Sequence, residues 1–347
     1  MLRKVLLLVL VAVSLSSFTA VFAQDEMTEI ASGLNSPRHL FYGADGSLYI
    51  AEAGKGGEIE GEGPFGPATY GETSQFSVVS PEGEQSVLIP GLISLDAGFG
   101  QIEGAMAIYV TESSYWAVLG LGLKEAPEGK NVEALVEYDR ETLEVKQVVD
   151  LRAFETENNP DESDEIVANP ADIAVDADGK VYIADASANS LLTWTPDDGV
   201  QLFAAWPVVE GELSAVPTSV SIGPDGDVYV GFLSGFPFPA GGARIERYAA
   251  DGTLKQTYEG LTLVTDVLVT EDGTIYAVQF ADGFGDQGYN AGTGSVVTVS
   301  EDGLETVAGE LNFPYGIALS PDGTLAVSVE SFGVAPDSGK VIAVGGM

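Results

Sequence analysis

Five segments of the chain share one pattern of apolar and polar positions. Each begins with an alternating apolar run, continues through Asp-Gly, and ends with a second alternating run. An Asp-Gly pair between two period-two runs is the strongest short-range signal for a β-hairpin, because glycine adopts the positive φ that a tight turn requires. Each segment therefore predicts two antiparallel strands. The segments begin at Pro37, Pro170, Pro217, Val264 and Pro314, and their turn aspartates are Asp45, Asp178, Asp225, Asp272 and Asp322.

The spacing of these segments predicts a β-propeller. Consecutive turn aspartates from Asp178 onwards lie 47, 47 and 50 residues apart, close to the roughly 40–50 residues of a propeller blade. Two further apolar runs follow most hairpins, which gives four strands per unit. The longer gap between Asp45 and Asp178 holds one more unit, AMAIYVTES followed by ALVEYDR and VKQVVDL, whose Asp-Gly turn is lost. We therefore expect an all-β fold with six blades.

The two ends of the chain predict how the ring closes. The C-terminus stops at KVIAVGGM, after what would be a third strand, and the segment from Thr28 to Gly33 resembles the fourth strands of other units. Because an open sheet edge invites aggregation, we expect this N-terminal strand to join the last blade as its outermost strand.

The first 23 residues predict a secretory signal peptide. Arg3 and Lys4 precede an apolar stretch at 5–13, and Val21-Phe22-Ala23 forms a small-x-small cleavage pattern. The apolar stretch is shorter than the roughly 20 residues of a membrane span. We expect a secreted protein, extracellular or periplasmic, with residues 24–347 forming one monomeric domain and no membrane span after cleavage. The absence of cysteine excludes disulfide bonds.

The net charge of the chain argues against one class of binding partner. It carries 53 acidic and 14 basic residues, a formal net charge of −39. Proteins bind nucleic acid by neutralising phosphate with lysine and arginine, so we expect no nucleic-acid partner. The simplest interpretation of the acidic surface is solubility outside the cell.

Long connections on the face opposite the Asp-Gly turns predict a binding face, since insertions confined to one face of a repeat fold usually carry function. We expect these connections at 52–73, 112–131, 231–242, 279–293 and 330–338. They contain aromatic residues among many glycines, which favours an aromatic-lined ligand site; the alternative is that the rings only pack against one another. The aromatic candidates are Tyr70, Trp116, Phe236, Phe238 and Phe284.

The loops that lead into the innermost strands open on the same face. Their polar residues should lie at the mouth of the central channel, and oxygen ligands converging there are the ligand type of calcium. The candidate ligand-binding residues are Arg38, His39, Asn169, Asp172, Thr218, Asp266 and Tyr315, and the candidate calcium ligands are Asn169, Asp172 and Asp266. No compact calcium-binding loop is present. The alternative is that these groups cap strands and bind water.

The single histidine, His39, limits the chemistry. It excludes a multi-histidine zinc or copper site, and no nucleophile-elbow motif accompanies it. A local pattern around Asp185 and Asn189 resembles the NHL-type blade signature. We interpret both as residues that stabilise a tight connection.

Four longer segments carry a resemblance that covers nearly the whole mature chain. They are ASGLNSPRHLFYGADGSLYIAEAGKGG from Ala31, VVDLRAFETENNPD from Val148, NPADIAVDADGKVYIADASANSLL from Asn169 and VPTSVSIGPDGDVYVGFLSGFPFPAGGARI from Val216. Together they resemble the ScyD/ScyE family of secreted six-bladed propellers with TolB/NHL-like repeats. The second unit and His39 depart from that family's pattern. The resemblance implies fold and export, and no reaction or catalytic residue.

Two functional hypotheses follow. The scarcity of histidine and the lack of nucleophile motifs favour a non-enzymatic binding or scaffold protein that uses its long-loop face and channel mouth for a small molecule or an extracellular partner. The alternative is a calcium-dependent hydrolase or lactonase of the gluconolactonase or strictosidine-synthase-like type. A quinone-dependent dehydrogenase fits less well, because basic groups for an anionic cofactor are few.

Overall fold

The computed structural model describes residues 27–63, 66–121 and 129–345. The predicted signal peptide lies outside these residues. Within them, no helix combines the length and the apolar character needed to cross a membrane.

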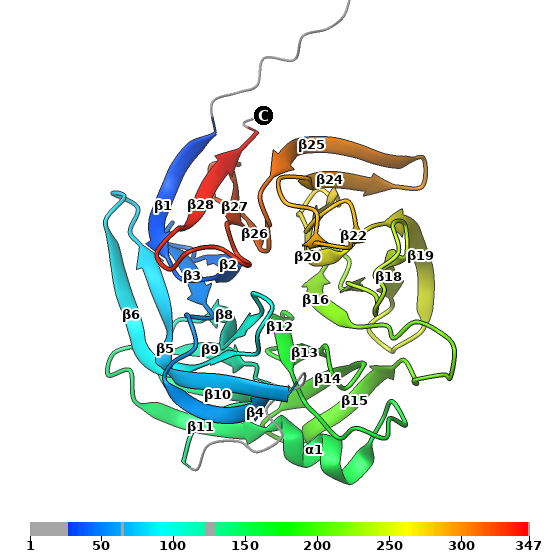
Figure 1. Ribbon diagram of the computed structural model, residues 1–347, viewed down its shortest axis with the longest axis horizontal. Helices are drawn as coiled ribbons and strands as arrows, with labels where there is room; N and C mark the ends of the chain where they lie inside the picture. The colour runs from blue at the N-terminus through cyan, green and yellow to red at the C-terminus, as the bar shows by residue number, and fades with distance from the viewer. Residues whose placement is uncertain (1–26, 64–65, 122–128, 346–347) are drawn as a thin grey trace, which may run out of the picture.

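Six antiparallel sheets are arranged around a common centre (Figure 1). Each is named here by its order along the ring and is given from the innermost strand outwards. Sheet 1 contains β2 (Pro37–Tyr42), β3 (Leu48–Glu52), β5 (Gly66–Val79) and β6 (Gln85–Asp96), with β4 (Ile59–Gly63) and β7 (Ile102–Glu103) paired to β5 and β6. Sheet 2 contains β8 (Ala105–Val110), β9 (Ser114–Leu119), β10 (Ala134–Asp139) and β11 (Val145–Asp150). Sheet 3 contains β12 (Pro170–Val175), β13 (Val181–Asp185), β14 (Ser190–Thr195) and β15 (Gly199–Ala205).

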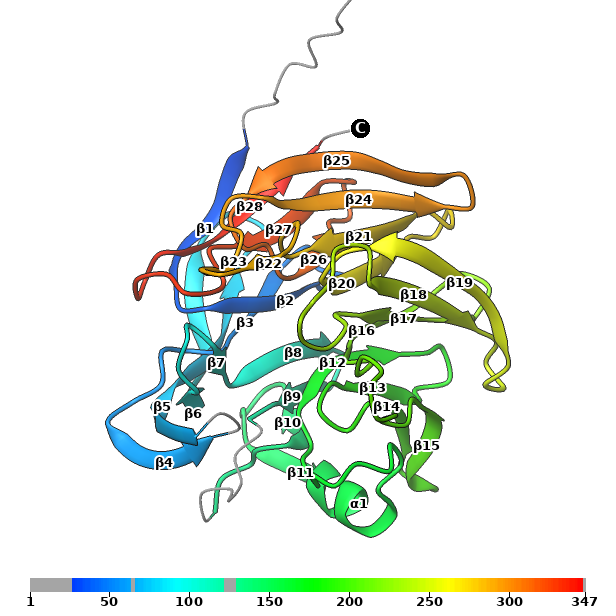
Figure 2. The same ribbon diagram turned by 45° about the vertical axis from the view of Figure 1, so that its right-hand side comes forward.

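The other three sheets continue the ring. Sheet 4 contains β16 (Pro217–Ile222), β17 (Val228–Phe232), β18 (Ala243–Tyr248) and β19 (Leu254–Leu261). Sheet 5 contains β20 (Val264–Val269), β21 (Ile275–Gln279), β24 (Gly294–Ser300) and β25 (Gly303–Leu311), and the hairpin of β22 (Phe284–Gly285) and β23 (Gly288–Tyr289) lies between β21 and β24 in sequence. Sheet 6 contains β26 (Ile317–Leu319), β27 (Leu325–Val329), β28 (Gly339–Val344) and β1 (Thr28–Leu34). The α-helix α1 (Leu151–Asn158), the only one in the part of the chain that the structure describes, lies at the outer edge near β11 and β15 (Figure 2).

The Asp-Gly hairpins form as predicted. In all five, the glycine after the aspartate has a φ between 79° and 88°, the left-handed region that an L-residue with a side chain rarely adopts. The tyrosine that follows each of the first four turns packs between sheets, and Tyr182, 1% exposed, is the most buried of them.

The core is divided among the junctions between sheets. Six clusters of buried side chains each join two neighbouring sheets, including one that joins sheet 6 to sheet 1 through residues such as Leu34, Leu48 and Ala326. Strands β3, β13, β17 and β27 are buried at every position, because each sheet packs against a neighbouring sheet on both faces.

The N-terminal strand pairs with the C-terminal strand. β1 runs antiparallel to β28 from Thr28 opposite Ala343 to Leu34 opposite Gly339, and the blue and red ends of the chain lie side by side (Figure 1). Ala31 and Leu34 of β1 are buried in the junction with sheet 1.

Two predicted loops contain strands instead. β9 begins at Ser114, so Trp116, for which the sequence predicts a loop at 112–131, is a strand residue. Its ring packs 4.9 Å from that of Trp194, between sheets 2 and 3. Most of the predicted loop at 52–73 is the β4–β5 hairpin, and Tyr70 lies in β5, half-buried against a small cluster that includes Leu95. Both predicted connections are therefore shorter than expected, because the β4–β5 hairpin occupies most of the first and β9 occupies the start of the second.

Candidate functional site

The second and third positions of the inner-strand segments have different environments. Consecutive residues of a strand point to opposite sides. The second-position residues Arg38, Thr218, Thr265 and Tyr315 line a cavity at the channel mouth. The third-position residues His39, Asp172, Ser219 and Asp266 are buried. The predicted channel-mouth set therefore divides in two, because His39, Asp172 and Asp266 are not part of the cavity lining, whereas Arg38, Asn169, Thr218 and Tyr315 are.

The buried group centres on His39. Its Nδ1 lies 3.5 Å from Oδ1 of Asp172 and 3.3 Å from Oδ2 of Asp266. The Ser219 hydroxyl lies between the two carboxylates, 3.1 Å from Asp172 Oδ2 and 2.8 Å from Asp266 Oδ1. Gly316 allows β26 to approach, since a Cβ at this position would lie 2.5 Å from the carbonyl oxygen of Arg38.

Backbone amides complete the coordination of both carboxylates. Asp172 accepts hydrogen bonds from the N–H groups of Ile173 and Val220, at 2.8 and 2.9 Å. Asp266 accepts from Val267 and Ile317, at 2.7 and 2.8 Å. The side chains thereby connect inner strands of different sheets around the channel.

The charges of this group are coupled. Burial alone would lower the pKa of His39, but the carboxylates of Asp172 and Asp266 outweigh it and raise the pKa from 6.5 to about 9. Burial raises the pKa of Asp172 from 3.8 to about 6, against the opposing effect of His39. At neutral pH the group is therefore an imidazolium held between carboxylates. Its ring also meets Tyr315 edge to face, with centroids 5.3 Å apart.

These residues do not fit a calcium ion in this arrangement. His39, Asp172 and Asp266 offer one donor atom each within 4.8 Å of one another. Calcium takes six to eight oxygen ligands, whereas one donor here is the protonated imidazole and every carboxylate oxygen already accepts a protein hydrogen bond. Asn169, the third predicted calcium ligand, is not in this group and lines the cavity instead.

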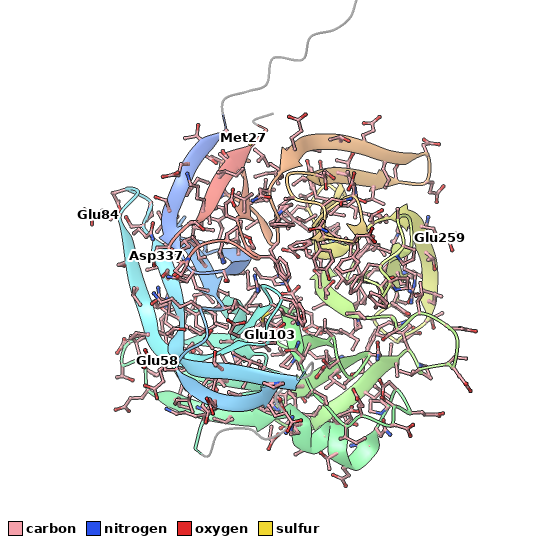
Figure 3. All side chains as sticks on the ribbon, viewed as in Figure 1. Met27, Glu58, Glu84, Glu103, Glu259 and Asp337 are labelled. Atoms are coloured by element: carbon pink, nitrogen blue, oxygen red, sulfur yellow. The ribbon has the colours of Figure 1, made fainter. Side chains whose placement is uncertain are left out.

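The cavity at the channel mouth has a volume of about 480 Å³. Its polar floor includes Glu103, which we did not single out from the sequence. Glu103 belongs to β7, is 7% exposed, and lies near the centre of the ring in Figure 3, whereas Glu84 and Glu259 lie at its rim. The available signal was its place two residues before Ala105, which begins the innermost strand of sheet 2; the lost Asp-Gly turn of that unit obscured it.

Glu103 lines this cavity and has a buried oxygen without a hydrogen-bond partner. Its Oε1 accepts a hydrogen bond from the side chain of Gln101 at 2.8 Å, and its Oε2 has no hydrogen-bond partner. Burial raises the pKa of Glu103, opposed by the charge of Arg38 and by the amide groups of Gln101 and Asn169. A buried carboxyl with a raised pKa in a cavity is typical of a group that gains or loses a proton in function.

Asn169, another residue of the cavity lining, packs its side-chain oxygen against Gly120, where an added Cβ would lie 2.4 Å from it. Its side-chain Oδ1 is buried without a partner, while its backbone N–H donates to Asp185 Oδ1 at 2.7 Å. Asp185 also accepts from the N–H of Ala188, and Asn189 binds Asp161, Ser214 and Val216. These contacts agree with the structural role proposed for Asp185 and Asn189, and they fix the loop that presents Asn169 to the cavity.

Arg38 and Tyr315 separate the cavity from the buried histidine. Arg38 donates to the carbonyl oxygens of Ser331 and Ile102 at 2.6 and 2.5 Å, and its guanidinium carbon lies 4.7 Å from the centre of the Tyr315 ring. The guanidinium is therefore fixed in position, with its charge beside Glu103.

Aromatic side chains form one wall of the cavity. Two of the five predicted aromatic residues, Phe236 and Phe238, belong to it, and Phe284 lines an adjoining cavity. Tyr70 and Trp116 line neither cavity. Three further aromatic residues of the predicted long connections complete the wall, namely Phe280, Tyr289 and Phe332.

Comparison with known proteins supports the fold class. A gluconolactonase from Xanthomonas campestris matches 92% of this chain and 89% of its own, with a TM-score of 0.56 and 11% identity. A calcium-binding regucalcin from Agrobacterium tumefaciens matches 92% of each chain, with a TM-score of 0.54 and 14% identity. A streptogramin B lyase matches 92% of this chain and 97% of its own, with a TM-score of 0.52 and 12% identity. Identities this low show the fold alone.

Comparison at the sequence level gives no assignment. No family model matches the chain, and no curated protein matches it. Membership of the ScyD/ScyE family therefore stays a prediction, whereas the strands, the sheets and the structural similarities together confirm an all-β propeller.

Proposed function

We propose that this protein hydrolyses a small organic ester or lactone in the cavity at its channel mouth. The observation that carries the proposal is the buried Glu103, which has an unpartnered Oε2 and a raised pKa at the polar floor of a 480 Å³ cavity. The similarity in fold to a gluconolactonase supports this class of reaction. The proposal follows the hydrolase alternative from the sequence rather than the preferred non-enzymatic interpretation.

Glu103 acts as the general base. Its Oε2 has no hydrogen-bond partner in the protein, so it is an acceptor available for the proton of the water that hydrolysis consumes. The water oxygen attacks the carbonyl carbon while its proton passes to the Glu103 carboxylate. The carbon–oxygen bond to the alcohol then breaks, and the departing alkoxide takes that proton from Glu103.

Arg38 provides the positive charge of the site. Its guanidinium is held beside Glu103 by two backbone carbonyls and the Tyr315 ring. A fixed charge stabilises the oxyanion that develops on the carbonyl oxygen without reorganisation. The mechanism contains no calcium-dependent step, because the grouped residues do not fit that ion.

Glu103→Gln tests the proposal. With purified protein and a panel of p-nitrophenyl esters and simple γ- and δ-lactones, we expect this variant to lose at least about 100-fold in kcat, the usual contribution of a general base. In the unaltered protein, activity should increase with pH through a midpoint above the usual glutamate pKa, since the base works as the carboxylate. Glu84→Gln, at the rim of the ring (Figure 3), should keep full activity. Equal rates for the Glu103→Gln and Glu84→Gln variants would overturn the assignment.

Non-catalytic binding of a small molecule is the second candidate. It is favoured by the lack of an activated nucleophile among the described cavity residues, since the Ser219 hydroxyl is buried between Asp172 and Asp266 and outside the cavity lining. Ligand binding without hydrolysis of any compound in the panel would establish this candidate instead.

A further inference from the structure

A second cavity adjoins the first. It has a volume of about 1,090 Å³ and shares Gln101, Phe236, Phe238, Tyr289 and Phe332 with the channel-mouth cavity. Its other walls come from the β22–β23 hairpin and from the loops around Phe99 and Gly333. We call the two together the aromatic groove. Because the two cavities share these lining residues, one ligand can contact both cavities.

The aromatic side chains of the groove differ strongly in burial. On its inner side, Phe280 and Phe313 are buried and stacked with centroids 5.1 Å apart. On its outer side, Phe99, Phe236 and Phe284 are 90%, 72% and 38% exposed. Packing among the rings therefore accounts for the buried aromatic side chains on the inner side. It does not account for the outer aromatic side chains, which are exposed to solvent.

Two of the outer rings, those of Phe236 and Phe284, pack against each other and against neighbouring rings. Phe236 lies 5.9 Å from Phe238 and 6.0 Å from Phe284 between ring centroids, and Phe284 lies 4.9 Å from Tyr289, all in edge-to-face contacts. Large apolar groups gathered around a cavity of an otherwise charged protein usually mark a binding site. Such preformed rings bind an apolar group at low entropic cost.

The charges around the groove restrict the ligand. Glu103, Glu165 and Asp286 line it, and Arg38 is the one basic residue among its described lining, with its guanidinium already engaged. An anionic ligand would face these carboxylates and the net charge of −39.

We propose that the substrate is an elongated, uncharged or cationic ester or lactone with a large apolar part, which lies in the second cavity while the reacting carbonyl lies over Glu103. The position of the carbonyl rests on the proposed function; the binding of the apolar part does not. Small sugar-acid lactones, polar throughout, would leave the aromatic groove unfilled.

A neutral fluorescent probe tests the groove independently of catalysis. N-phenyl-1-naphthylamine, titrated into the mature chain, should bind with increased fluorescence. Phe236→Ala and Phe284→Ala should each weaken its binding about tenfold, while Leu254→Ala, an exposed apolar residue on the outermost strand β19, should leave it unchanged. Absence of binding, or equal affinity in all three variants, would overturn the proposal that the aromatic groove binds apolar ligands.

The substrate class is tested by acyl length. Between the p-nitrophenyl esters of a two-carbon and an eight-carbon acid, kcat/KM should increase at least about tenfold, and Phe236→Ala should remove most of this increase. A rate independent of acyl length would refute the substrate class while leaving hydrolysis at Glu103 in place. Probe binding without hydrolysis of either ester would refute the proposed hydrolase activity and would still support the aromatic groove as a binding site.

Discussion

His39 places a positive charge between two buried carboxylates of the channel, those of Asp172 and Asp266. Its Nδ1 faces Asp172 and Asp266, and Arg38 and Tyr315 are its other charged or titratable neighbours. Burial raises the pKa of Tyr315, so this residue stays neutral up to pH 10. Removing one partner from a buried ion pair usually costs about 3–5 kcal/mol, because the remaining charge stays buried.

His39→Gln should therefore lower the free energy of unfolding and change its dependence on pH. The pKa rises from 6.5 to about 9 on folding, so the native state holds this proton more tightly. The resulting stability, about 3 kcal/mol at about 1.4 kcal/mol per pKa unit, is complete below pH 6.5 and is lost as pH rises through about 9. Urea unfolding at pH 6 to 10 should show this decline in the unaltered protein and a flatter profile in the variant. Parallel profiles would contradict an imidazolium at this position.

The alternation of residues within a strand could have separated the two layers of the site from sequence. Arg38 and His39 are neighbours in β2, so one must point to the cavity if the other points to the buried centre. The sequence does not show how deeply each of the two groups of residues is buried. That depth depends on contacts such as Tyr315 against both Arg38 and His39, which join residues almost 280 positions apart.

Strands and turns were the most predictable elements, because their signals are local. The Asp-Gly pairs and period-two runs located the hairpins, whereas sheet 2, whose turn lacks Asp-Gly, was assigned a loop that begins two residues before β9. Glu103 was missed for a related reason. Its strand β7 has two residues and no periodicity, and two of its neighbours, Arg38 and Asn169, come from distant parts of the sequence.

β1 supports a prediction about stability. Deleting residues 27–34 removes the partner of β28 and exposes the junction between sheets 6 and 1, where Leu34 is 1% exposed. We expect thermal unfolding at a markedly lower temperature than in a chain that begins at residue 27. Leu34→Ala should lower the free energy of unfolding by about 2–5 kcal/mol, the usual cost for a buried leucine. This loss would show how much of the effect of the deletion comes from this one side chain. Unchanged unfolding after the deletion would show that β1 does not hold the ring.

The whole molecule carries far more negative than positive charge. With 53 acidic and 14 basic residues, most carboxylates have no cationic partner available, and their mutual repulsion opposes the compact state. Ion pairs such as those of Arg247 with Asp225 and Asp227 relieve this repulsion only locally. Ions in solution screen the remainder, over a distance that falls from about 30 Å at 0.01 M to about 3 Å at 1 M.

Salt should therefore stabilise this protein without any specific requirement for calcium. We expect the unfolding temperature to rise between 0.01 M and 1 M NaCl, and CaCl₂ at matched low ionic strength to add little beyond this screening effect. A chelator should leave the unfolding temperature unchanged, because the imidazolium of His39 already supplies the positive charge between Asp172 and Asp266. A chelator-sensitive unfolding temperature that calcium restores would contradict this, and would favour the calcium-dependent hydrolase over the metal-free mechanism at Glu103. His39→Gln provides the matched comparison, since calcium should stabilise the variant more than the unaltered protein if the two carboxylates accept either cation.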